Sequence, residues 1–75
     1  MGRLKPEPFR ETKRRLERAG FLETSQRGSH VKFVRRQGDV IDTVIVPNKR
    51  QIPVGTLHSI LNQAHLSLEE WEGLA

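Results

Sequence analysis

The sequence predicts a small α+β domain in which two helices cover one face of a three-stranded antiparallel sheet. Three observations predict this fold class. Apolar residues recur at helical spacing near both ends of the chain, and its middle has three stretches of strand character separated by short turns. The 75 residues are enough for a single domain over residues 1–75, and the absence of cysteine excludes a disulfide framework.

The first helix is expected over residues 7–19, after a loose lead at residues 1–6. Pro8 is favoured in a first helical turn, and Glu7 and Glu11 suit the positive end of the helix dipole. Gly20 can adopt the left-handed conformation that ends a helix. The residues that share one stripe at helical spacing are Phe9, Thr12, Leu16 and Ala19.

Three strands are expected in the middle of the chain, at residues 21–26, 29–36 and 40–46. Turns at Arg27-Gly28 and Gln37-Gly38-Asp39 would join them into an antiparallel meander. The third strand is a β-branched run, the clearest strand pattern in the chain. Pro47 would end it, because proline lacks the N–H group that a strand ladder needs.

A second helix is expected from about Pro53, after a polar loop. Its end is less defined, since His65 stands where glycine or asparagine is the easier choice. Ser67 and Glu70 have the spacing of a capping box, which predicts a short final helical turn. The apolar face of the second helix would carry Leu57, Ile60, Leu61 and Ala64.

The resulting order is α-β-β-β-α with a short C-terminal helical turn. Because each helix has one apolar face, both are expected on the same side of the sheet, with the other side partly open. Double-stranded RNA-binding domains share this order of elements. An order of elements does not by itself assign a function.

The positive charge is concentrated in the first two thirds of the chain. Residues 1–50 contain all thirteen Lys and Arg residues and six acids, a net charge of +7, whereas residues 51–75 carry −3. A pI of 10.4 fits a polyanionic partner such as nucleic acid, and it also fits a merely solvated surface. The same alternatives hold for the Arg14, Arg15 and Arg18 group, which could contact phosphates or an acidic protein.

Several other classes are not supported by the sequence. No run approaches the roughly 20 apolar residues of a membrane span, and no secretory signal is evident, so a cytoplasmic protein is expected. Three scattered histidines without a carboxylate cluster predict no metal site. No cofactor and no small-molecule ligand are expected.

His30 is the residue on which a chemical hypothesis can be built. It follows the glycine turn, and alternation along the second strand places it with Lys32 on the face opposite Val31 and Phe33. Since Val31 and Phe33 suit a core, His30 and Lys32 should point to the open face. An imidazole there is suited to general acid–base chemistry. The alternative is that His30 only ends a turn.

Cleavage of RNA needs little machinery beyond such a histidine. The 2′-hydroxyl of the substrate can act as nucleophile, so His30 could serve as base or acid without a metal ion. The cations that could stabilise the phosphorane are Lys32, Lys49 and Arg50. A serine–histidine hydrolase is disfavoured, because Ser29 faces away from His30 and no orienting carboxylate is evident.

At several positions the sequence resembles the HicA (YcfA-like) mRNA interferase toxins. The motifs that carry the resemblance are Ala19-Gly20-Phe21, Arg27-Gly28-Ser29-His30, Phe33, Val46-Pro47, Gly55-Thr56-Leu57, Ile60-Leu61, Gln63-Ala64 and Leu66-Ser67-Leu68-Glu69-Glu70. The resemblance implies a double-stranded-RNA-binding-like fold, metal-independent cleavage of mRNA and a HicB-type antitoxin that occludes the active site. It also implies that His30 is catalytic, because the family's catalytic histidine follows Gly-Ser, here Gly28-Ser29.

The chain departs from this family pattern at three places. A second histidine is often found after the Val-Pro pair, where this chain has Asn48-Lys49-Arg50. Gln51 replaces an acidic residue, and Ala64-His65 replaces an Ala-Gly turn. The first change could lower activity or shift a supporting role to Lys49. His58 is expected to be a surface residue, and His65 a helix-end residue.

The leading hypothesis is therefore a toxin-type endoribonuclease in which His30 is the acid or base, and Gly28 and Ser29 shape its turn. Lys32, Lys49 and Arg50 would bind RNA or stabilise charge. The alternatives on the same fold are a non-catalytic RNA-binding module and a basic protein-interaction domain.

Overall fold

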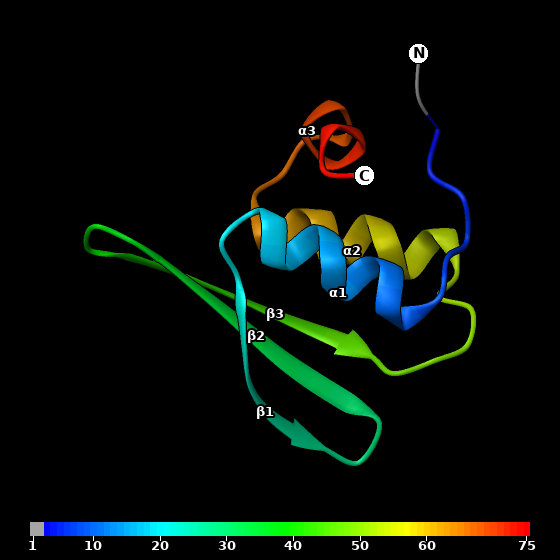
Figure 1. Cartoon of the computed structure of the whole chain (residues 1–75), viewed down its shortest axis with the longest axis horizontal. Helices are drawn as coiled ribbons and strands as arrows, with labels where there is room; N and C mark the ends of the chain where they lie inside the picture. The colour runs from blue at the N-terminus through cyan, green and yellow to red at the C-terminus, as the bar shows by residue number, and fades with distance from the viewer. Residues whose placement is uncertain (1–2) are drawn as a thin grey trace.

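The structure is a computed structural model that describes residues 3–75, and it has the predicted order of elements (Figure 1). The elements are α1 (Phe9–Arg18), β1 (Leu22–Arg27), β2 (His30–Gln37), β3 (Val40–Pro47), α2 (Val54–Ala64) and α3 (Leu68–Gly73). The strands form one antiparallel sheet in the order β1-β2-β3. Helices α1 and α2 lie side by side over the same face of this sheet, as predicted (Figure 1). The short α3 is the expected C-terminal helical turn.

Helix α1 begins two residues later than the sequence predicted. Glu7 is not helical, because it exchanges two backbone hydrogen bonds with Ile52, of 3.3 Å and 2.7 Å. Pro8 is extended and serves as the N-cap residue. Of the lead expected at residues 1–6, Leu4 packs half-buried against the core, and residues 1–2 lie outside the described part of the chain.

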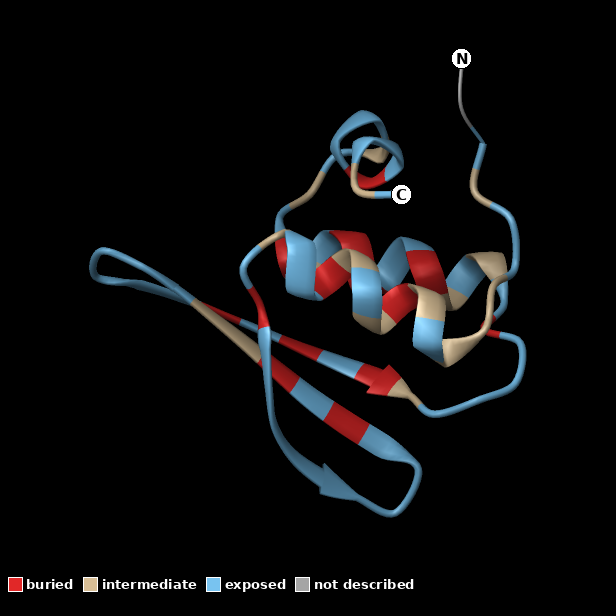
Figure 2. Cartoon of the chain, viewed as in Figure 1, coloured by how far each residue is buried: buried red, intermediate tan, exposed pale blue. Residues whose placement is uncertain are grey.

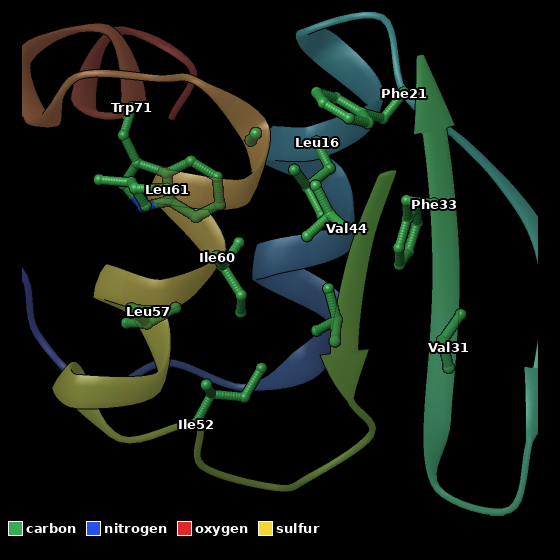
Figure 3. Packing of buried hydrophobic residues seen from close by; sticks show 12 residues of the cluster. Leu16, Phe21, Val31, Phe33, Val44, Ile52, Leu57, Ile60, Leu61 and Trp71 are labelled. Atoms are coloured by element: carbon green, nitrogen blue, oxygen red, sulfur yellow. The ribbon is translucent and has the colours of Figure 1, made fainter. Parts of the chain in front are cut away.

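The hydrophobic core lies between the two long helices and the sheet and extends to α3 through Trp71 (Figure 3). It consists of Leu16, Phe21, Val31, Phe33, Val44, Val46, Ile52, Leu57, Ile60, Leu61, Ala64 and Trp71. Buried and exposed residues alternate along β2 and β3 (Figure 2), so one face of the sheet packs on the helices and the other faces solvent. The predicted orientation of Val31 and Phe33 toward the core is confirmed.

A polar network closes one end of the core. Arg35 points to the helix side of β2, where its guanidinium donates to Asp42 (2.9 Å) and lies 4.6 Å from the centre of the Phe21 ring. The same guanidinium donates to the carbonyl oxygens of Ala19 (3.2 Å) and Ala64 (3.0 Å). These two residues end α1 and α2, so Arg35 fixes both helix C-termini to the sheet.

His65 ends α2 in the left-handed conformation, with φ 57° and ψ 40°. This position is usually glycine, because a Cβ atom makes it unfavourable. The predicted helix-end role is confirmed, and the structure adds a partner that the sequence did not reveal. The imidazole Nδ1 lies 2.8 Å from a carboxylate oxygen of the buried Asp42.

Helix α3 is fixed by its cap and by one arginine. The predicted capping box is present: Glu70 N donates to Ser67 Oγ (3.0 Å), and Ser67 N donates to Glu70 Oε1 (2.8 Å). Arg15 of α1 lies over the Trp71 ring, 5.5 Å from its centre, and donates to the Trp71 carbonyl oxygen at 2.8 Å. The buried Trp71 thereby joins α3 to α1.

The outer edge of β3 has its own hydrogen-bond partner. Ile45 N donates to the side-chain oxygen of Gln63 on α2, at 3.0 Å. This N–H group points away from β2, and two residues further along the same edge Pro47 has no N–H group at all.

Candidate active site

His30 is the first residue of β2, directly after a two-residue turn. Gly28, the first residue of that turn, has φ +59°, and glycine at this position is typical of a tight hairpin. In the sheet register, His30 lies between Arg27 on β1 and Pro47 on β3. The side chain is exposed on the open face of the sheet, as predicted.

A shallow cavity of about 490 Å³ surrounds His30 on this face. Its lining residues are Ser25, Arg27, His30, Lys32 and Ile45. Lys32 lies opposite Ser25 and Ile45 in the register, so the predicted pairing of an imidazole with an ammonium group on one surface is present. The cavity therefore combines one group suited to proton transfer with two cations.

Arg27 is the residue of this cavity that the sequence reasoning did not assign a role. The signal was available, because the two residues that flank a two-residue hairpin turn lie opposite each other. Arg27 and His30 must then share a face, and the register shows them paired. A carboxylate is missing from the residues that line the described cavity.

Lys49 and Arg50 do not line the cavity of His30. They line a second, smaller groove of about 270 Å³, together with Pro8, Phe9, Arg10 and Asn48. The two sites are neighbours, because Asn48 N donates to the carbonyl oxygen of Ser29 at 2.6 Å. The predicted cations are thus divided between the two sites. Lys32 lies in the cavity of His30, and Lys49 and Arg50 lie in the smaller groove.

The cations of the protein fall into two groups. Lys13, Arg15 and Arg35 pair with carboxylates at 3.0, 3.3 and 2.9 Å, and Arg14 pairs with Glu11. Arg18 donates to the carbonyl oxygens of Leu74 and Ala75. The arginine group of α1, Arg14, Arg15 and Arg18, therefore contacts oxygen atoms of the same chain. Within residues 3–75, the cations that line the two sites and have no ion pair are Arg10, Arg27, Lys32, Lys49 and Arg50.

Residues 3–75 contain no cluster of three or more histidine, aspartate or glutamate side chains placed to hold a metal ion. Over the same residues, every helix is too short or too polar to cross a membrane.

Comparison with protein families identifies the chain. The model of the HicA toxin of bacterial toxin–antitoxin systems matches residues 9–66, from the first residue of α1 to beyond the end of α2. The chain belongs to the HicA toxin family. No curated protein matches it. Membership of the HicA family supports a toxin role in a toxin–antitoxin system and implies an antitoxin partner.

Proposed function

We propose that this HicA-family toxin is an endoribonuclease that cleaves mRNA in the cytoplasm without a metal ion, with His30 as general acid or base. The observation that carries the proposal is the cavity in which His30 is exposed with Arg27 and Lys32. Neither cation has an ion-pair partner within the described residues, so both are free to bind a phosphate.

The chemistry needs three contributions, of which the chain supplies two. The RNA 2′-hydroxyl attacks the adjacent phosphorus as the bond from phosphorus to the 5′ oxygen breaks, which leaves a 2′,3′-cyclic phosphate and a 5′-hydroxyl. His30 takes the proton of the 2′-hydroxyl or gives a proton to the leaving 5′ oxygen, and water carries out the other proton transfer. Arg27 and Lys32 stabilise the negative charge that develops on the phosphorane. Gly28 and Ser29 set the turn that presents the imidazole, and Lys49 and Arg50 bind RNA beyond it.

The open face of the sheet is also the surface that a HicB-type antitoxin would cover. Large apolar side chains are exposed on it, with Leu22 at 69%, Ile41 at 55% and Ile45 at 40% exposure. Ile41 and Ile45 lie opposite the cations Arg36 and Lys32 of the same face, and Leu22 lies opposite Val34. An acidic partner with apolar anchors fits such a surface, and its binding would occlude His30.

An RNA cleavage assay tests the proposed function. It compares the wild-type protein with the His30→Ala variant, both in the presence of a metal chelator. His58 on α2 is also exposed, so His58→Ala is the matched control. We expect His30→Ala to reduce the cleavage rate by roughly a hundredfold or more, as for loss of a general acid or base. Circular dichroism and RNA binding should stay unchanged. Undiminished cleavage by His30→Ala, or cleavage abolished by the chelator, would contradict the proposal.

One observation favours a second candidate, a non-catalytic RNA-binding module. The cavity holds a single imidazole, so a second protein group for proton transfer is not evident among its lining residues. Such a module would bind RNA in a salt-sensitive manner and leave it intact at every pH tested.

A further inference from the structure

The groove beside the β3–α2 loop is, we infer, a second nucleotide-binding subsite of the same RNA. In it, Arg10, Lys49 and Arg50 hold a phosphate that flanks the scissile one, and the half-buried Phe9 and Pro8 contact the attached ribose or base. Arg10 of α1 is thereby an RNA-binding residue. The inference rests on the proposed function and extends it from the cleavage site to the strand beside it.

Two backbone hydrogen bonds bring three separate segments together at this groove. Phe9 N, at the start of α1, donates to the carbonyl oxygen of Lys49 at 3.1 Å. Asn48 N donates to Ser29 O at 2.6 Å, directly before His30. The groove and the histidine are therefore held in a fixed relation by rigid backbone, and a strand of RNA that lies across His30 reaches the groove next.

The charges in the groove have no internal compensation. Its six lining residues include three cations and no acid. Glu11, the acid next to Arg10 in the chain, already pairs with Arg14. Arg10 also lies in the first turn of α1, where the positive end of the helix dipole disfavours a cation. Three like charges at this place destabilise the free protein, and a bound phosphate would relieve their repulsion.

The floor of the groove favours a nucleotide over an acidic peptide. Phe9 is only half-buried, and its ring is tilted by 44° against Phe33 with the ring centres 6.3 Å apart. Phe33 belongs to the core, so the Phe9 ring has a firm support. An aromatic surface with cations at its rim matches a base or ribose with its phosphate, whereas an acidic side chain has no apolar part of that size.

The test compares Arg10→Gln with Arg14→Gln, which removes the same charge from the same helix outside the groove. Binding to a single-stranded RNA oligonucleotide is measured over a range of salt concentrations, on the His30→Ala background so that the RNA stays intact. Loss of one phosphate contact should reduce the slope of log affinity against log salt by about 0.7 and weaken binding roughly three- to tenfold for Arg10→Gln. Arg14→Gln should change neither quantity.

Cleavage kinetics separate this inference from the proposed function. With His30 intact, Arg10→Gln should raise KM for a long RNA and leave its kcat unchanged, and it should leave cleavage of a dinucleotide unaffected. If the wild type cleaves RNA and Arg10→Gln binds RNA like Arg14→Gln, the subsite is refuted while the proposed function stands. If no cleavage occurs but Arg10→Gln still weakens RNA binding, the subsite stands without the catalysis. Weakened binding to an acidic antitoxin, with unchanged RNA affinity, would overturn the inference.

Discussion

His65 Nδ1 lies 2.8 Å from Asp42 Oδ1, a contact that joins the end of α2 to the beginning of β3. The other carboxylate oxygen of Asp42 accepts from Arg35, which also holds the C-termini of α1 and α2. One buried carboxylate thus connects two strands with both long helices. The network sits at the end of the sheet away from His30, so its perturbation should affect stability before activity.

Asp42 should make the stability of the protein sensitive to acid. The Arg35 guanidinium holds the pKa of the Asp42 carboxyl below its usual range, and His65 adds to the effect. Because the folded pKa lies below the unfolded one, the stabilisation is complete above about pH 4 and is lost as the pH falls through the folded pKa. Urea unfolding between pH 2 and pH 7 should show this fall in unfolding free energy. The Asp42→Asn variant should be less stable at pH 7, and its unfolding free energy should fall less toward acid pH. If the pH profiles of the variant and the wild type run parallel, the acid sensitivity does not come from Asp42.

Replacing the left-handed His65 by glycine should have two opposing effects on the free energy of unfolding, and a second substitution can separate them. His65→Gly relieves roughly 1 kcal/mol of backbone strain and removes the contact to Asp42. In the Asp42→Asn background the contact is already weakened, so the relief should dominate and the variant should be stabilised. In the wild-type background the net effect should be smaller or negative. Chemical denaturation measures the change in unfolding free energy that His65→Gly causes in each background. Equal changes in the two backgrounds would show that the contact between His65 and Asp42 contributes nothing to stability.

The turn before His30 can be tested against a turn of the same kind. Gly28 and Gly38 each begin a two-residue hairpin turn with φ near +60°, and a Cβ atom at either would meet nothing within 4 Å. Alanine at either position should cost about 1 kcal/mol of stability through backbone strain alone. Only Gly28→Ala should also slow RNA cleavage, because the Gly28 turn orients His30. Equal cleavage by the two variants would mean that the turn does not position the imidazole.

Arg27 should contribute to the chemical step. Arg27→Gln removes the cation opposite His30 in the register and should lower kcat for RNA cleavage by about tenfold or more. Lys32→Gln should act in the same direction. Arg36 lies further along β2 and does not line the cavity, so Arg36→Gln is the control and should leave kcat near the wild-type value. A raised KM with unchanged kcat in Arg27→Gln would instead assign the residue to binding.

Local patterns were sufficient to predict the elements and the two faces of the sheet. Periodicity gives helices and strands directly, and alternation along β2 places His30 outward because Val31 and Phe33 are apolar. The family motif then pointed to His30 as the candidate catalyst. The start of α1 was missed, since the pairing of Glu7 with Ile52 joins residues 45 positions apart.

The parts that could not be predicted are those assembled from distant segments. Alternation along β2 puts Arg35 on the same face as Val31 and Phe33, but its partners lie on β3 and at the ends of α1 and α2, and nothing in the local sequence names them. In the same way, the contact of Phe9 with Lys49 decides that Lys49 lines a groove with Arg10. The sequence therefore suggested a single group of cations, whereas in the structure Lys32 lines one cavity and Lys49 and Arg50 line another.

The hydrogen bond from Ile45 to Gln63 limits how other chains can associate with the protein. An exposed strand edge is a template for strand addition, and β3 is such an edge. Near the candidate active site, however, the Ile45 N–H is already used and Pro47 has none, so an incoming strand would find no free donor at these two positions. Addition of a further strand to the β3 edge, in fibrils or strand-swapped dimers, is thus disfavoured beside His30. On this side of the sheet, a protein partner would contact the region of His30 through the open face, where its side chains, not its backbone, determine recognition.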